Sequence, residues 1–490
     1  MRQPKRRMSQ NTNQIAPTPY PPGFRARRGL NWFILGLMYA SYYMCRYNFR
    51  FATPGMVAEF GFSKSDIADM LSAWSIAYGT GQLVNGLLTD RIGGKAAMLI
   101  GAVGTIAVNL FFGFGSFVGT FSTFALIWLV NGWFQSFGAP GMIKINAAWF
   151  NRQERGTFAG VFGFMIQSGQ MAISKLAPII LGGFTIGAFV VAEGEWRWLF
   201  RIPPIFTAAV AVLLALIPKE TPEAAGFHGV VSDGDGKVGE STRASLKESF
   251  MTIFTHPLVW FYALAYACTG AVRNSSDQLA VLYFVEQLKL DIAKSQAVAW
   301  TFLLMPMVAV FGSFTAGWVS DKFFKGHRSP VAMTLYFFES LVILCAAMVI
   351  YMGVVGPTPT GIVLGCLFLV LVSLTANSTH AIVGAAAPMD IGGRRMAGFA
   401  AGVIDSFQYY GTAIALPITG RLIDKFGWGV WYPTMASFGA IGGVAMILVM
   451  RKQRLLHRWE ETSFRLRLKQ IEHGMRLQRR RLRAMSKAYA

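Results

Sequence analysis

The chain has 490 residues, of which 53% are hydrophobic and only 14% are charged, and its formal net charge is +21. So much apolar surface does not fit inside a water-soluble protein, which excludes a soluble enzyme or binding domain. The basic excess lies in the tails: residues 1–30 hold seven Lys or Arg and no acid, and residues 451–490 hold thirteen against three acids. The tails therefore carry 17 of the 21 net charges, and no nucleic-acid partner is expected.

Apolar windows of about 20 residues recur along the chain, and each is long enough to cross a ~30 Å hydrocarbon layer as a helix. The strict alternation that is typical of a membrane β-barrel is not present. The sequence therefore predicts an all-α membrane protein with twelve transmembrane helices. These helices are expected to start near Leu30, Ile67, Ala96, Phe124, Gly156, Trp198, Leu258, Ala297, Val331, Gly361, Met396 and Trp428.

A polar segment after Pro218 divides the expected spans into six and six. The expected units are a basic N-terminal tail (1–29), a six-helix bundle (30–218), a linker (219–255), a second six-helix bundle (256–450) and a basic amphipathic tail (451–490). Basic residues mark every second loop, so the positive-inside rule places these loops, the linker and both termini in the cytoplasm. The last tail fits a helix on an anionic leaflet, a partner-binding helix or a solvated topology anchor.

The two halves repeat each other. Arg46 and Arg273 are 227 positions apart, and the pairs Asp90-Arg91 and Asp321-Lys322 are 231 apart. Parallel repeats indicate two bundles related by an axis along the membrane normal, with a ligand site between them near the midplane. The acid–base pairs at the helix ends are candidate gating residues, which form ion pairs in one conformation and break them in another. The alternative is that they only contribute to the cytoplasmic charge.

An arginine costs at least ~2.5 kcal/mol at the centre of a lipid-facing helix, so Arg46 and Arg273 should face a bundle interior or a water-filled space. Tyr39, Tyr42 and Tyr43 lie on the same helical face as Arg46. Two planar guanidinium groups that face each other describe a site for a phosphate or carboxylate. Alternatively, each arginine pairs with a buried carboxylate such as that of Asp277 or Asp405 and only holds helices together.

Other site types have little support. The four cysteines fall inside expected spans without metal-ligand or paired spacing, so we expect no metal site and no disulfide. The Gly-rich stretch at 113–119 lacks the ending of a phosphate-binding loop, and hydrolase and zinc-protease motifs are absent. We expect no cofactor and no enzymatic activity.

The residues that line the expected site resemble those of a known family. The runs YASYYMCRYNF (39–49), SIAYG (75–79), NGWFQ (131–135), ERG (154–156) and QY (408–409) resemble the organophosphate:phosphate antiporters of the major facilitator superfamily. That family includes glycerol-3-phosphate and hexose-phosphate transporters. The resemblance implies twelve helices and rocker-switch alternating access. It also implies substrate-binding residues, which are Arg46, Arg273, Tyr39, Tyr42, Tyr43, Tyr78 and Tyr409.

Several positions depart from the family pattern. Gln82 stands where the glycerol-phosphate members have a Lys, and their fifth-helix His falls on Ile166, beside Gln167, which we add to the candidate substrate-binding residues. The chain also has Asp405, His380 and Lys175 inside expected spans. Asp405 and His380 are candidate coupling residues because an intramembrane acid and histidine are parts of proton relays. Alternatively, Asp405 pairs with Lys175 or Arg273, and His380 is a hydrogen-bonded interior histidine.

We therefore expect a monomeric, multi-pass protein of the inner membrane that transports a phosphorylated organic metabolite in exchange for inorganic phosphate. Its expected partners are these small molecules and membrane lipid. Two alternatives stay open, which are proton-coupled transport of another organic anion and a membrane sensor of phosphate esters built on the transporter fold.

Overall fold

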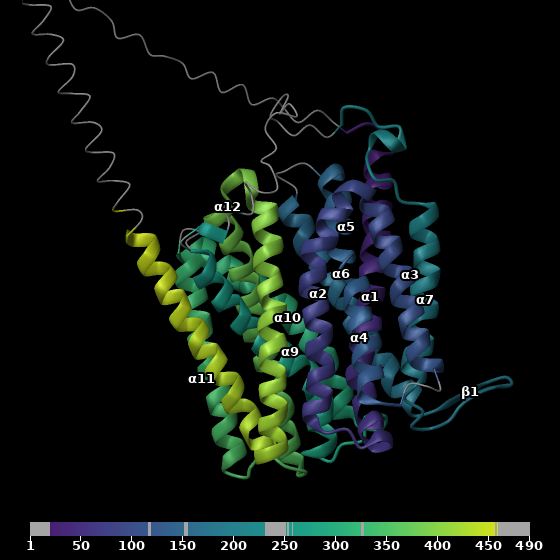
Figure 1. Cartoon of the computed structure of the whole chain (residues 1–490), viewed down its shortest axis with the longest axis vertical. Coiled ribbons are helices and arrows are strands. Elements are labelled where there is room, and N and C mark those ends of the chain that lie inside the picture. The colour runs from purple at the N-terminus through teal and green to yellow at the C-terminus, as the bar shows by residue number, and fades with distance from the viewer. Residues whose placement is uncertain are drawn as a thin grey trace, which may run out of the picture.

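The structure is a computed structural model that describes residues 20–115, 119–150, 155–230, 251, 254–256, 258–324, 328–455 and 458; for 155–162 and 385–401 it describes the backbone alone. Long helices run side by side along one axis (Figure 1). The elements are α1 (Phe24–Phe60), α2 (Lys64–Ile92), α3 (Gly94–Phe114), α4 (Phe121–Gln135), α5 (Gly138–Trp149), α6 (Arg155–Leu181), β1 (Phe184–Ile186), β2 (Phe189–Val191), α7 (Trp198–Leu216), η1 (Glu223–Ala225), α9 (Val259–Glu286), α10 (Gln296–Phe323), α11 (Arg328–Tyr351), α12 (Pro359–Phe426), η3 (Trp428–Val430) and a helix over 431–455.

Each expected span corresponds to helical residues, so the all-α prediction is confirmed. The fourth span consists of α4 and α5, which are separated by Ser136 and Phe137. The tenth and eleventh spans both belong to α12, which has 68 residues. At 1.5 Å per residue such a helix has about 100 Å of length, enough for two crossings of a ~30 Å layer. It turns back between them, because Asn377 contacts Arg273 and Thr412 contacts the neighbouring Asn274 of α9.

Six helices of the described part are long and apolar enough to cross a membrane by composition alone, which are α3, α7, α10, α11, Pro359–Gly384 of α12 and Trp428–Leu455. The other long helices contain polar residues that interrupt their apolar windows. In α1 these include Arg46, Asn48 and Arg50, and all three side chains are buried. Because polar side chains are costly in lipid, such helices belong inside the bundle, where they can form a polar site.

Each half contains an equivalent close contact between two of its own helices. A Cβ atom added to Gly169 of α6 would overlap the carbonyl oxygen of Ala40 in α1, and one added to Gly411 of α12 would overlap that of Ala267 in α9. Ala40 and Ala267 are 227 positions apart, which is the separation of Arg46 and Arg273. The internal repeat seen in the sequence is therefore a repeat of helix packing as well.

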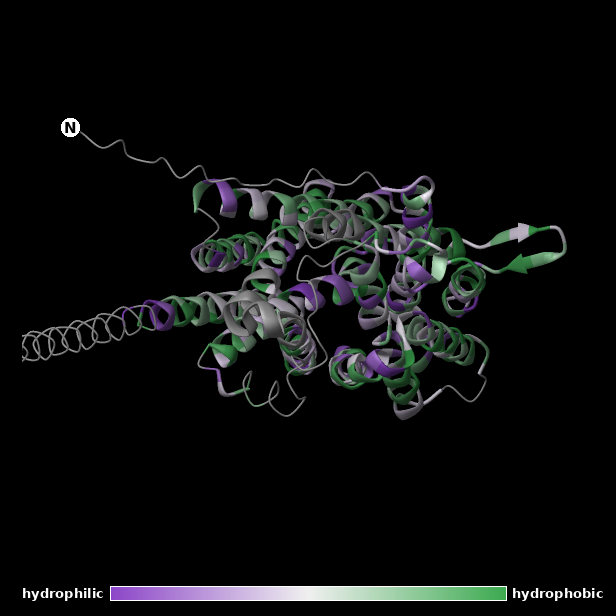
Figure 2. Cartoon of the chain, turned by 90° about the horizontal axis from the view of Figure 1, so that it is seen from above, coloured by the Kyte–Doolittle hydropathy of each residue, from purple (hydrophilic) through white to green (hydrophobic). Residues whose placement is uncertain are grey.

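A short β-hairpin joins α6 and α7, and the sequence analysis did not predict it. β1 and β2 pair antiparallel, with Phe184 opposite Val191, and the turn places Gly187 at φ 60°. The hairpin extends sideways beyond the helices in both views (Figures 1 and 2). Ile186 and Val190 are 70% and 63% exposed on it.

Candidate functional site

Arg46 lies in a box of aromatic rings. The carbon at the centre of its guanidinium is 4.9 Å from the ring centroid of Tyr43, 4.5 Å from that of Trp74 and 4.4 Å from that of Tyr78. Aromatic faces attract a cation without neutralising it. The box thus holds a buried positive charge in place and leaves it available to an anion.

The two arginines are fixed by matching contacts in the two halves. Arg46 Nε donates a 3.0 Å hydrogen bond to Gln135 Oε1 in α4, and Arg273 Nε donates a 2.9 Å bond to Asn377 Oδ1 in α12. Each amide is itself held by its NH2 group. Gln135 donates to the carbonyl of Cys45 at 3.2 Å, and Asn377 donates to that of Ser373 at 2.8 Å. These bonds set the direction in which each planar guanidinium points.

The outer nitrogens of both guanidinium groups remain unengaged. Among the described residues, neither Arg46 nor Arg273 has a carboxylate oxygen within 4.0 Å, and each donates only through Nε. Both side chains are buried, with 5% and 7% of their surface exposed. A buried, unpaired cation is costly, so this arrangement favours an anionic ligand over the alternative in which each arginine pairs with a helix carboxylate.

Four of the expected tyrosines gather around these arginines. The Tyr39 and Tyr78 hydroxyls are 3.3 Å apart, and the ring centroids of Tyr78 and Tyr409 are 4.4 Å apart. Tyr43 and Tyr409 are close enough to interact electrostatically with both guanidinium groups. α1, α2 and α12 therefore place phenol groups from both halves beside the two cations.

Two expected site residues are placed differently. The Tyr42 hydroxyl donates to the backbone carbonyl of Met98 in α3, so it is engaged within the first half. Gln167 of α6 is half-buried, and its Oε1 is a buried atom that has no hydrogen-bond partner in the described part of the chain. Such an atom is available to a ligand donor or to water.

The candidate coupling residues lie in the second half, near Arg273. The Asp405 carboxyl interacts electrostatically with both arginines. His380 Nδ1 is 2.8 Å from the Tyr266 hydroxyl, and the two rings stack. Lys175 instead lies over the Trp300 ring, with Nζ 5.1 Å from its centroid.

Arg50, one turn after Arg46, was not singled out in the sequence. It is fully buried and crosses to the other half, where Nη1 donates to the Asp277 carbonyl at 3.1 Å, while Nη2 donates to Ser174 Oγ at 3.0 Å. Its position four residues after Arg46 was the available signal. Trp74, Gln135 and Asn377 were also missed as site residues. Gln135 ends the NGWFQ run that carries the family resemblance, whereas the signal for Trp74 and Asn377 was a polar or amphipathic side chain within an apolar span.

The expected gating residues make few contacts. Asp90 lies 3.9 Å from Lys144 of the same half, and within the described residues no ion pair involves Arg91, Asp321 or Lys322. Lys322 instead lies over the Trp318 ring, with Nζ 4.6 Å from its centroid.

Ion pairs between the halves occur at the opposite end, where α1 ends and α2 begins; we call it the latch end. Arg421 of α12 forms two hydrogen bonds to Asp69, at 3.1 and 3.0 Å. The Asp424 carboxylate accepts from the backbone N–H groups of Lys64 and Ser65 at the start of α2, at 3.0 and 2.8 Å. Carboxylates at helix N-termini are stabilising, so these contacts hold the latch end closed in this conformation.

Two further ion pairs join the halves at the latch end. Lys64 lies 3.2 Å from Glu286, and Lys294 lies 2.7 Å from Glu193. The Glu193 hydrogen bond and charge raise the pKa of the Lys294 ammonium, as expected for an ion pair. The pairs that a rocking motion would have to break are therefore at this end.

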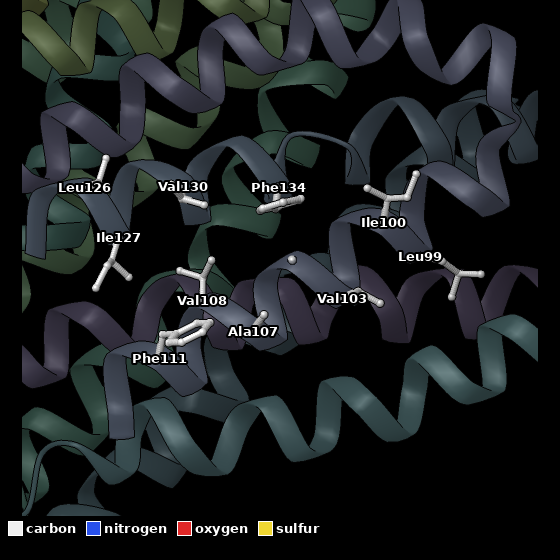
Figure 3. Close-up of a pocket in the computed structure, with 11 residues that line it drawn as sticks. Leu99, Ile100, Val103, Ala107, Val108, Phe111, Leu126, Ile127, Val130 and Phe134 are labelled. Atoms are coloured by element: carbon white, nitrogen blue, oxygen red, sulfur yellow. The ribbon is translucent and has the colours of Figure 1, made fainter. Parts of the chain in front are cut away.

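A pocket of about 760 Å³ lies between α3 and α4 and is not part of this site (Figure 3). Its wall is apolar, with Val103 and Phe111 from α3 and Val130 and Phe134 from α4. Without a polar group it cannot select a charged ligand, and in a membrane it suits acyl chains.

Comparisons with known proteins identify relatives over most of the chain. The chain is 28% identical to the glycerol-3-phosphate transporter of Bacillus subtilis, over 80% of this chain and 85% of the relative. It is 26% identical to a probable hexose phosphate transport protein of Chlamydia trachomatis, over 84% and 88%. It is 24% identical to the membrane sensor protein UhpC of Escherichia coli, over 85% and 90%.

A solved structure named as a D-xylose-proton symporter shares the fold, with a TM-score of 0.65 at 13% identity over 85% of this chain and 96% of that one. With these relatives, the resemblance found in the sequence and the expectation that the chain is not an enzyme are confirmed. The family model for the major facilitator superfamily matches residues 35–416. Two six-helix halves with repeated packing and a match over most of the sequence show that this chain belongs to the major facilitator superfamily.

Proposed function

We propose that this protein is a secondary active transporter of a phosphorylated organic metabolite, such as a sugar phosphate, which it exchanges for inorganic phosphate by alternating access. The observation that carries the proposal is the matched pair Arg46 and Arg273. Each holds Nε on a fixed amide and leaves its outer nitrogens free for two oxygens of a phosphoryl group. The names of the relatives support a phosphate ester as the substrate.

The remaining parts of the site fit this role. Phenol groups of Tyr39, Tyr78 and Tyr409 donate hydrogen bonds well to phosphoryl and sugar oxygens. The closed latch end opposes the end where Arg91 and Lys95 lie, and the distribution of basic residues favours a cytoplasmic location for that basic end. We propose an inner-membrane monomer with both termini and the 219–255 linker in the cytoplasm, and with Asp90, Arg91, Asp321 and Lys322 engaged when that end closes.

The direct test is an exchange assay. Proteoliposomes loaded with labelled inorganic phosphate are exposed to a panel of phosphorylated three- to six-carbon compounds, each paired with its unphosphorylated parent. We expect at least one phosphate ester, and no parent compound, to stimulate release of the label. Release that no panel member stimulates, from protein shown to be folded, would contradict phosphate exchange.

Asp405 supports a second candidate, which is proton-coupled transport of an organic anion. An acid near two arginines weakens their attraction for an anion when it is ionised, so its protonation and anion binding should favour each other. We expect Asp405→Asn to abolish stimulation of uptake by an inward proton gradient and to leave exchange intact. Glu223→Gln, at an exposed position in η1 for which no side-chain hydrogen bond or ion pair is found among the described residues, is the control and should change neither activity.

If Asp405→Asn lowered both activities equally, the residue would have a structural role. A third candidate function is supported by the relative that is named as a membrane sensor. In this function the protein binds a phosphate ester and signals through the 451–490 tail. Deleting that tail distinguishes it, because transport should survive the deletion and signalling should not.

A further inference from the structure

Glu339 is a buried acid that takes no part in the site described above. It lies in the middle of α11, one of the apolar helices that could cross a membrane, and none of its surface is exposed. The helix is fixed on both sides of it. The Tyr336 hydroxyl contacts the Ala265 carbonyl of α9 at 2.5 Å, and Ser340 Oγ donates to the Ala436 carbonyl at 2.5 Å.

The carboxyl group has very few partners. Its Oε2 is 3.1 Å from Thr379 Oγ1 in α12, and its Oε1 is buried and has no hydrogen-bond partner among the described residues. No lysine, arginine or histidine of the described residues lies within 4.0 Å of it. An ionised carboxylate needs several donors or a cation to be stable away from water, and neither is present here.

The single donor is moreover shared. Thr379 Oγ1 also lies 2.9 Å from the Thr375 carbonyl, and a hydroxyl has only one proton to donate. If Glu339 is protonated, its Oε2–H donates to Thr379 Oγ1, and the Thr379 proton goes to the Thr375 carbonyl. Both contacts are then complete hydrogen bonds. If Glu339 is ionised, one of the two contacts must lose its proton.

We propose that Glu339 is a proton-binding site, which carries a proton in this conformation. The titratable groups that face it are Cys268 of α9 and Tyr336 of α11, and both are neutral donors or acceptors at physiological pH. Thr379 is two residues after Asn377, which holds Arg273, so α12 connects the proton site to that arginine. Release of the proton requires α12 to move away from α11 far enough to admit water, which accepts the proton and supplies the donors that stabilise the carboxylate. This site is independent of the identity of the transported anion.

Infrared difference spectroscopy on the purified full-length protein tests the proposal. The spectrum of the wild type minus that of Glu339→Gln, at neutral pH, should contain the C=O band of a protonated carboxylic acid, and the band should shift in heavy water. Carboxylate bands in the same difference spectrum would overturn the proposal. Because the Gln amide can donate to Thr379 Oγ1 as the acid does, we expect Glu339→Gln to keep the melting temperature of the wild type.

A second variant keeps the test decisive if Glu339→Gln does not fold. Thr379→Val replaces the hydroxyl by a methyl group on the same β-branched frame and so removes the acceptor of the proposed acid. The protonated-acid band should persist in Thr379→Val and move to the frequency of a more weakly hydrogen-bonded group. A spectrum identical to that of the wild type, or one with an added carboxylate band, would overturn the assignment.

Discussion

Replacing Arg46 or Arg273 by lysine is expected to weaken binding of a phosphate ester by roughly ten- to a hundredfold. Lysine keeps the charge and loses the fork that binds two oxygens at once. It also lacks a group equivalent to Nε, so Gln135 or Asn377 no longer fixes the direction of the cation. A charge-assisted hydrogen bond contributes about 1.5–3 kcal/mol, and 1.4 kcal/mol corresponds to tenfold in affinity.

The measurement is ligand affinity together with thermal stability in detergent, for both variants. Arg197→Lys is the matched control, because Arg197 binds Glu59 through two nitrogens, at 2.8 and 2.7 Å, on a partly exposed surface outside the anion site, so the substitution removes a fork without touching the ligand. It should bind like the wild type. Near-normal affinity in Arg46→Lys and Arg273→Lys would show that the two arginines are not the anion site, and a fall in melting temperature alone would indicate a scaffolding role.

The sequence was sufficient to predict where the helices lie and that Arg46 and Arg273 are buried inside the bundle. The reason is physical. Apolar windows are defined by the thickness of the membrane, which is the same for all twelve spans. An arginine within such a window stands out because its charge has to be satisfied in the interior. Neither inference requires knowing which helix lies next to which.

The partners of those arginines could not be predicted in this way. Gln135 and Asn377 become site residues only because α4 and the first part of α12 pack beside Arg46 and Arg273 at one particular rotation. The same holds for the latch end. Asp69 and Asp424 belong to no motif, whereas the repeated pairs at Asp90 and Asp321 do, and the sequence therefore drew attention to the opposite end of the bundle.

The sequence also could not show which acids, if any, form ion pairs with the two arginines. The sequence offered Asp277 and Asp405 as examples of carboxylates that could pair with the arginines. Among the described residues neither acid has a carboxylate oxygen within 4.0 Å of an arginine nitrogen, and the Tyr47 hydroxyl lies 3.5 Å from Asp277 Oδ2. Both acids are near the arginines and form no ion pair with them among the described residues. Asp405→Asn therefore removes a titratable charge without breaking an ion pair of the anion site, and so it can separate proton coupling from exchange.

Gly411→Ala is expected to destabilise the folded protein by about 3 kcal/mol, at the upper end of the cost of overpacking. The added Cβ would overlap the Ala267 carbonyl oxygen, and a backbone atom in the middle of α9 cannot turn aside as a side chain can. Ala267 precedes Arg273 by six residues, and Gly411 follows Tyr409 by two, so this crossing also sets the spacing between that arginine and that tyrosine. Separating the helices should therefore weaken ligand binding in whatever protein still folds.

The matched control is Gly402→Ala in the same helix, where an added Cβ would meet no atom of the described residues within 4 Å. Alanine is favoured over glycine inside a helix by about 1 kcal/mol, so both substitutions gain equally from helix propensity, and the difference between them isolates the crossing. Melting temperature and the yield of monodisperse protein in detergent are the readouts. A Gly411→Ala variant as stable as Gly402→Ala would mean that α9 and α12 can move apart at no cost, and a tightly packed crossing could then not be what positions Arg273 against Tyr409.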